Sequence, residues 1–208
     1  MLTAKEALER LRAGNREFVS SVRDGKPLPH NSRRAELPKV QDPFAIVLGC
    51  SDARVSHEII FGQGLNDLFV IRVAGNVVAP SVVGSVEYAV AGYNARLIVV
   101  LGHSHCGGVL STVKALQHPE EKLTPGLSSI VDRIKPSVEG LLKTELRNDM
   151  DALVDRAVRA NVGVSVNHLR HESKLVEKRI RNDGFAVVGA EYSLETGVVE
   201  FFDTMGAE

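Results

Sequence analysis

Cysteine, tryptophan and long apolar runs are scarce in this chain of 208 residues. It contains two cysteines and no tryptophan, and aromatic residues make up 5% of it. No apolar stretch approaches the roughly 20 residues needed to span a bilayer, and the amino terminus lacks the short hydrophobic core of a signal peptide. These absences argue against membrane association and predict a cytoplasmic protein, whose thiols are normally kept reduced.

Strong charge of either sign is also missing. The formal net charge is -1, and Arg33 and Arg34 make only a short basic pair. Without a basic stretch or a surface of stacking aromatics, we expect no nucleic-acid partner. No expected strand is followed by the glycine-rich fingerprint that cradles a nucleotide phosphate, so a nucleotide-binding role is disfavoured.

The residues that are present suit one α/β domain spanning 1–208. With 44% hydrophobic and 25% charged residues, the chain can bury a sizeable core. Aliphatic runs at 44–49, 68–73 and 96–101 are typical of buried strands, and a helical pattern at 81–93 separates the last two. This alternation predicts a parallel β-sheet core flanked by helices.

The two ends of the chain add to this core. Residues 1–40 are predicted to form a helical arm, which starts at a capping box from Thr3 to Glu6, and an extended connection. We expect the apolar side of the arm to pack on another subunit, and the alternative is that it folds back on its own sheet. After Pro125-Gly126, which is expected to break the chain, we predict helices near 128 and over 151–181, then a C-terminal antiparallel pair over 185–192 and 198–202.

Each cysteine follows one of the buried strands. Cys50 comes directly after the first, and Cys106 follows the third, with His103 three residues before it. Ligands of parallel sheets collect beyond the carboxyl ends of the strands, and two sulfurs with one imidazole suit zinc. Three protein ligands leave a fourth position for water or a displaceable side chain, as in catalytic zinc sites. The alternatives are two small buried hydrophobic residues or a disulfide between them.

The segments at these positions resemble those of the β-class carbonic anhydrases. Residues 50–54 read Cys-Ser-Asp-Ala-Arg, where that family has Cys-x-Asp-x-Arg, and residues 103–108 read His-Ser-His-Cys-Gly-Gly, where it has His-x-x-Cys-Gly. The resemblance is dense from 41 to 108 and looser towards both ends. It implies one Zn2+ per subunit bound by Cys50, His103 and Cys106. It also implies a catalytic dyad of Asp52 and Arg54.

The resemblance implies reversible hydration of carbon dioxide to bicarbonate and a proton by zinc-bound hydroxide. Two thiolates neutralise the metal, so we expect less acidic water than on a three-histidine zinc, where its pKa is about 7, and activity that rises on the alkaline side. A bidentate guanidinium of Arg54 would hold Asp52 ionised and aimed at that water. In an unrelated chain, the same Asp-x-Arg would be an ordinary ion pair at a strand end.

Four further residues are candidates for substrate binding. Gln41 lies nine residues before the first cysteine, where related enzymes carry a glutamine whose amide donates to bicarbonate. Phe69 and Tyr88 match residues that line the substrate pocket, although core packing explains them equally well. The backbone N–H of Gly107, at an expected helix start, is placed to receive an anion.

Regulated members of the family carry a second, non-catalytic bicarbonate site. A tryptophan, an arginine and a tyrosine build it, and the corresponding positions here are Val47, Arg72 and Tyr192. Since Val47 replaces the tryptophan, we do not expect that site to be intact. The sequence leaves open whether Asp52 or water fills the fourth zinc position at rest.

The remaining histidines support smaller expectations. His105 is expected to face solvent or to stand behind a ligand, and His57 is expected to be an exposed residue at a helix start, with proton transfer as the alternative. The others are expected on the surface: His30, His118, His168 and His171.

The resemblance further implies a homodimer or homotetramer with the active site near the dimer interface. Two other functions stay open at this point. One is hydrolysis of carbon disulfide or carbonyl sulfide on the same fold with the same ligands. The other is a zinc-stabilised scaffold without turnover, against which Asp52 and Arg54 argue, because a structural site needs four closed ligands and no dyad.

Overall fold

A five-stranded sheet forms the centre of the computed structural model, which describes residues 1–28 and 38–204. His30, Arg33 and Arg34 lie outside the described residues. The strand order is β2-β1-β3-β4-β5, and every neighbouring pair is parallel except β4 with β5. The strands are β1 Ala45–Gly49, β2 Leu68–Arg72, β3 Leu97–His103, β4 Ala186–Tyr192 and β5 Val199–Asp203. The predicted α/β class, with a parallel core and a C-terminal antiparallel strand, is confirmed.

The central strands are buried on both faces, which explains their unbroken aliphatic runs. Every residue of β1 and β3 is buried, and the two strands pair in register from Ile46 with Ile98 to Gly49 with Leu101. The edge strand β2 is only half-buried. The carboxyl ends of β1 and β3 therefore lie side by side in the middle of the sheet.

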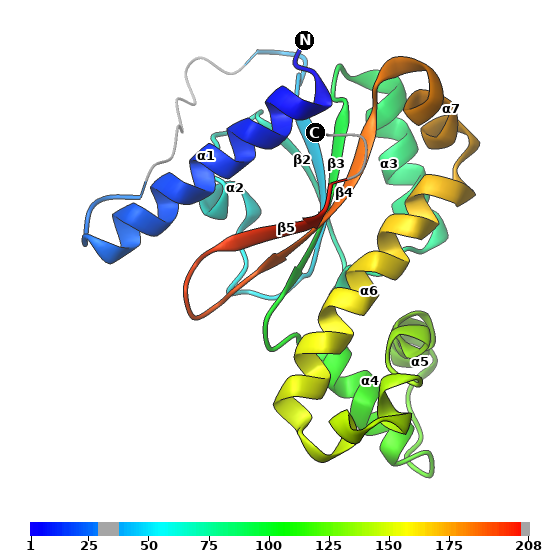
Figure 1. Cartoon of the computed structure of the whole chain (residues 1–208). Coiled ribbons are helices and arrows are strands. Elements are labelled where there is room, and N and C mark those ends of the chain that lie inside the picture. Colours follow the sequence, from blue (N-terminus) through cyan, green and yellow to red (C-terminus); the bar gives the residue numbers. More distant parts are fainter. Residues whose placement is uncertain (29–37, 205–208) are drawn as a thin grey trace.

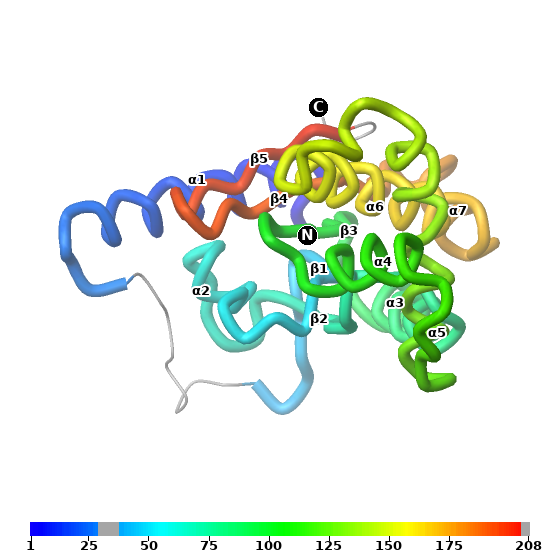
Figure 2. Tube along the Cα trace, turned by 90° about the horizontal axis from the view of Figure 1, so that it is seen from below, coloured from blue at the N-terminus to red at the C-terminus, as the bar shows by residue number. Residues whose placement is uncertain are grey.

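Helices cover both faces and one end of this sheet. Figure 2 shows α1 and α2 on one side of the strands and α3, α6 and α7 on the other. In Figure 1, α4 and α5 lie beyond the carboxyl ends of the parallel strands. The helices are α1 Ala4–Arg23, α2 His57–Ile60, α3 Pro80–Gly92, α4 Gly107–Gln117, α5 Pro125–Ile134, α6 Met150–Glu172 and α7 Lys174–Asp183. Short 3-10 turns are η2 Ala74–Asn76, η3 Lys135–Ser137, η4 Leu141–Lys143 and η5 Glu145–Asn148.

The arm helix α1 packs against its own sheet. The predicted capping box is present, since Thr3 Oγ1 accepts the N–H of Glu6 while the Glu6 carboxylate accepts the N–H of Thr3. Leu8, Leu11 and Phe18 are buried in one cluster with side chains of β1, β3 and β4. The arm therefore folds back on its own sheet, which was the alternative to the expected contact with another subunit.

Two sequence-based boundaries are wrong. The single helix predicted over 151–181 is two helices, because Ser173 takes an extended conformation and its Oγ accepts the N–H of Val176, capping α7. Pro125 begins α5 and does not break the chain, since a proline at the first helical position loses no hydrogen bond and Thr124 caps the helix. Among residues 1–28 and 38–204, no helix is long and apolar enough to cross a membrane.

Candidate metal centre

Two neighbouring strands and one helix start bring three potential metal ligands together. Cys50 directly follows β1, His103 is the last residue of β3, and Cys106 is the N-cap of α4. Their ligand atoms all lie within 4.8 Å of one another, and all three residues are buried. Both cysteines are free thiols, so the disulfide considered above is not formed. Two soft sulfurs and one imidazole nitrogen in this arrangement fit a zinc ion.

The orientation of His103 is that of a metal ligand. Its Nδ1 lies 2.9 Å from the backbone oxygen of Ser104, and a carbonyl oxygen can only accept, so Nδ1 carries the proton. The other nitrogen, Nε2, is buried and has no hydrogen-bond partner among the described residues. Burial of such a nitrogen costs free energy unless it forms a hydrogen bond or binds a metal. A backbone carbonyl behind a histidine ligand commonly fixes the tautomer in this way.

The electrostatics of the two sulfurs also favour a cation. Contact with Cys106, followed by the nearby ring of His103 and the hydrogen bond from the N–H of Gly75, lowers the pKa of Cys50 to about 4. The same contact with Cys50, together with burial, raises the pKa of Cys106. Two thiols at this distance compete for one negative charge. A bound divalent cation would remove the competition and would hold both cysteines as thiolates.

Asp52 and Arg54 form a bidentate pair beside the sulfurs. Arg54 donates from Nε to Asp52 Oδ1 over 2.9 Å and from Nη2 to Oδ2 over 2.7 Å. These bonds lower the pKa of Asp52, which is ionised at neutral pH. Asp52 Oδ2 also lies 3.9 Å from Nε2 of His103. The carboxylate is therefore fixed at the rim of the ligand cluster.

Arg72 stabilises the backbone of the segment that carries Cys50 and Asp52. The register places Arg72 opposite Gly49, and its guanidinium donates to the backbone oxygens of Cys50, over 3.1 Å, and Asp52, over 2.7 Å. The sequence connected Arg72 only with the second bicarbonate site and missed this contact. The register of the two strands would have been needed to find it. The other two positions of that site, Val47 and Tyr192, are buried in β1 and β4.

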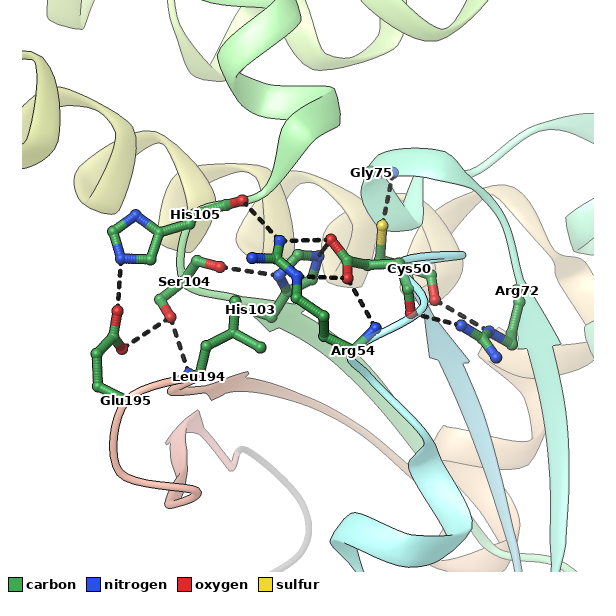
Figure 3. A network of polar contacts seen from close by, with 10 residues as sticks. Cys50, Arg54, Arg72, Gly75, His103, Ser104, His105, Leu194 and Glu195 are labelled. Carbon is green, nitrogen blue, oxygen red and sulfur yellow. Dashed lines mark hydrogen bonds and ion pairs between the residues drawn. The ribbon is translucent and has the colours of Figure 1, made fainter.

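The turn between the ligands His103 and Cys106 is anchored to the β4–β5 hairpin. The Oγ of Ser104 donates to Glu195 and accepts the N–H of Leu194, and His105 pairs with the same carboxylate (Figure 3). His105 has a φ of 52°, and its side chain is 57% exposed. The side chain therefore faces solvent and Glu195, which is the first of the two places expected for it. The sequence pattern placed Glu195 only in the connection between the two predicted C-terminal strands, with no role at the site.

His57 is buried, so the prediction of an exposed helix-start residue is wrong. Its relative exposure is 0%, and a Cβ on Gly49 would lie 1.8 Å from its Nε2. The ring therefore lies directly against the last residue of β1. Burial, followed by the charge of Arg72, lowers the pKa of His57 to about 4. The ring is neutral at physiological pH, and its place is filled only because residue 49 is a glycine.

The predicted substrate residues divide into two places. Gly107 begins α4 beside Cys106. Phe69 and Tyr88, by contrast, have ring centroids 6.2 Å apart, and Tyr93 joins them and bonds Gln41. Phe69 pairs with Ile46, which precedes Cys50 by four residues, or about 13 Å along extended chain. The structure thus brings Gln41, Phe69 and Tyr88 together, away from the metal ligands of the same chain.

A parallel sheet with a thiolate-imidazole-thiolate cluster and an ion-paired aspartate at its carboxyl edge defines a metalloenzyme architecture. A family model described as carbonic anhydrase matches residues 45–199. "Carbonic anhydrase 2" of Mycobacterium tuberculosis is 39% identical over 202 residues, which cover 96% of this chain and 93% of that protein. A carbonic anhydrase of Mycolicibacterium smegmatis is 39% identical over 204 residues, covering 96% and 94%.

Solved structures agree with the sequence comparison. A β-carbonic anhydrase of Aspergillus fumigatus superposes with a TM-score of 0.73 at 25% identity, covering 94% of this chain and 89% of its own. A tetrameric β-carbonic anhydrase of Sordaria macrospora, at 23% identity, shares the fold with a TM-score of 0.71, over 91% and 93%. The chain belongs to the carbonic anhydrase family, as an enzyme of the β class.

Proposed function

We propose that this protein catalyses the zinc-dependent, reversible hydration of carbon dioxide to bicarbonate and a proton. The observation that carries the proposal is the buried cluster of Cys50, His103 and Cys106, whose free imidazole nitrogen lies 3.9 Å from the Asp52 carboxylate. Family membership supports the same reaction. A scaffold role is disfavoured, because the three ligands stand beside an ionised, oriented carboxylate that a purely structural site does not need.

When bound, zinc acts as a Lewis acid that lowers the pKa of water and so provides a nucleophile for carbon dioxide near neutral pH. The residues of the chain orient that chemistry. Asp52 is ionised and accepts hydrogen bonds only, so it can fix a water or hydroxyl group beside the ligands but cannot donate a proton to it. Arg54 engages both carboxylate oxygens, which opposes transfer of Asp52 to the metal. We therefore favour water in the fourth position.

The position of Gln41, Phe69 and Tyr88 supports an oligomeric enzyme. Phe69 lies opposite Ile46, about 13 Å along strand β1 from Cys50, and Gln41 and Tyr88 are grouped with it through Tyr93. Contact of this group with bicarbonate would therefore occur at the centre of another subunit. We propose a homodimer or homotetramer in which this aromatic group faces a partner. The tetrameric proteins of Sordaria macrospora are consistent with this. A reducing compartment such as the cytoplasm would keep both thiols available.

Stopped-flow measurement of carbon dioxide hydration from about pH 6 to 9, the range in which such a water titrates, with metal content determined on the same sample, tests the proposal. We expect about one zinc per chain and a rate that rises with pH. Cys106→Ser should lose metal and activity together, whereas Asp52→Ala should keep its zinc and lose activity by on the order of 10²-fold. Zinc-free wild-type protein, full activity of Asp52→Ala, or turnover of carbon disulfide without turnover of carbon dioxide would contradict it.

A further inference from the structure

The 3-10 turn η2 donates a backbone hydrogen bond to one of the metal ligands. The N–H of Gly75 points at Cys50 Sγ over 3.4 Å, within the limits for a sulfur acceptor (Figure 3). Gly75 has a φ of 66°, a conformation that side chains rarely adopt. A Cβ there would also lie 2.6 Å from Cδ1 of Ile134. A glycine at position 75 therefore places a backbone N–H beside the sulfur where a side chain would not fit.

The first turn of α4 limits movement of η2 on one side. A Cβ on Gly108 would lie 3.1 Å from both the N and the Cα atom of Gly75, so the two backbones are in close contact. Gly108 follows the ligand Cys106 by two residues. The turn is thus in contact with both the metal centre and α4.

Helix α6 holds η2 with two further hydrogen bonds from buried polar side chains. Asn161 donates from Nδ2 to the oxygen of Gly75 over 2.8 Å, and Ser165 donates from Oγ to the oxygen of Asn76 over 3.0 Å. Asn161 and Ser165 are four residues apart and so lie on one face of the helix. They are 1% and 2% exposed. Polar groups at such depth are stabilising only when bonded, and here their partners are the carbonyls of η2.

We infer that Asn161 is a positioning residue of the metal centre. The side-chain amide of Asn161 donates a hydrogen bond to the carbonyl of Gly75 and so fixes the position of that residue. The N–H of the same Gly75 donates to Cys50 Sγ. A hydrogen bond to a thiolate draws electron density away from the sulfur and so sets how strongly that sulfur donates to the metal. The inference rests on the proposed zinc function and adds to it a control of the Cys50 ligand from α6, through a turn that contains no ligand.

Cobalt(II) substitution makes the strength of the sulfur donor visible. When the N–H to sulfur bond weakens, the sulfur lone pair rises in energy, and the sulfur-to-cobalt charge-transfer band moves to longer wavelength. Asn161→Leu keeps approximately the size of the side chain and removes the donor, and Asn161→Ala removes the donor without any steric demand. Val166→Ala is the control. Val166 is also buried in α6, but it belongs to a hydrophobic cluster with side chains of the sheet and α3.

We expect the band to move to longer wavelength in both Asn161 variants. Zinc affinity in competition with a chelator should fall about tenfold, because η2 no longer holds Cys50 in the place from which it binds the metal. Val166→Ala should lower thermal stability while the band and the zinc affinity stay as in the wild type. Unchanged spectra and affinity in the Asn161 variants, or equal changes in Val166→Ala, would overturn the inference. A wild-type protein that binds neither zinc nor cobalt would instead overturn the proposed function itself, so the two failures are distinguishable.

Discussion

Gly49 and His57 show how closely the metal centre depends on single residues. The ring of His57 occupies the space that a side chain at position 49 would need, and Gly49 directly precedes the ligand Cys50. Both ring nitrogens are buried and have no hydrogen-bond partner within the part of the chain that the structure describes. The contact fixes the end of β1, and hence the point from which Cys50 reaches the cluster.

Replacing Gly49 by alanine should therefore disturb both folding and metal binding. A Cβ 1.8 Å from Nε2 of His57 cannot be accommodated without moving the ring or the strand end, and overpacking of this kind costs about 1–3 kcal/mol. We expect a lower free energy of unfolding in urea and weaker zinc binding. Gly163→Ala is the matched control, since a Cβ there meets none of the described atoms within 4 Å and should stabilise α6 by roughly 0.5–1 kcal/mol. Equal stability of Gly49→Ala and the wild type would contradict the contact.

The neutral state of His57 predicts a loss of stability in acid. Its pKa falls from 6.5 to about 4 on folding, so between these values the unfolded chain binds a proton that the folded protein excludes. The free energy of unfolding should therefore decrease as the pH falls below 6.5. The decrease due to His57 should reach roughly 3 kcal/mol and be complete below about pH 4. Urea titrations of the metal-free protein, with circular dichroism as the probe, measure this.

His57→Gln provides the comparison for that measurement. The variant carries no titrating group at this position, so the wild type should lose its advantage over the variant progressively between pH 6.5 and 4. Parallel pH profiles of the two proteins would show that the buried ring does not cause the acid sensitivity. The difference between the profiles is informative even if the variant is less stable at every pH, because only the slope reports the proton.

At the scale of elements, the sequence was most reliable where a strand is buried on both faces. The aliphatic runs at 44–49 and 96–101 are typical of strands buried on both faces, and they correspond to β1 and β3. The break at Ser173 within the predicted helix 151–181 was missed, because helical periodicity continues through Ser173 and the break depends on a contact far along the chain. Ser173 Oγ donates to Glu87 of α3 over 2.6 Å and also caps α7.

Ser173→Ala should consequently cost about 1–2 kcal/mol, because it removes the cap of α7 and leaves Glu87 without this hydrogen bond. Thermal or urea unfolding measures the effect. Ser85→Ala is the control: the Ser85 hydroxyl donates to the carbonyl of Ser81, one turn before it in α3, and its loss should stay within about 0.5 kcal/mol. Equal stabilities of the two variants would mean that Ser173 does not determine the junction of α6 and α7.

At the scale of the whole molecule, the exposed aromatic group on α3 and β2 predicts association. Tyr88 is 62% exposed, although it packs against Phe69 and Tyr93. Large aromatic residues at the surface are typical of interfaces. Sedimentation velocity at several concentrations should show a dimer or a larger assembly. A charge at Tyr88 should weaken it, since an unpaired charge is costly to bury.

Tyr88→Asp is the variant that tests this interface. We expect it to shift the assembly towards monomers and to lower carbon dioxide hydration, while its metal content stays as in the wild type. Leu127→Asp, on α5, adds the same charge at another exposed apolar residue and should leave assembly unchanged. A wild type that sediments as a monomer at all concentrations, or a Tyr88→Asp protein that associates normally, would contradict the proposed arrangement.

The class of fold, the three ligand candidates and the Asp52–Arg54 pair could all be predicted from the amino-acid sequence, because buried parallel strands and the local segments after them are encoded by neighbouring residues. Tertiary structure decided what contacts these segments from a distance. Arg72 on the carbonyls of Cys50 and Asp52, and Asn161 on Gly75, come from strand register and helix packing. Such contacts join residues 20 to 86 positions apart. No local pattern specifies them, since they form only when the whole core closes.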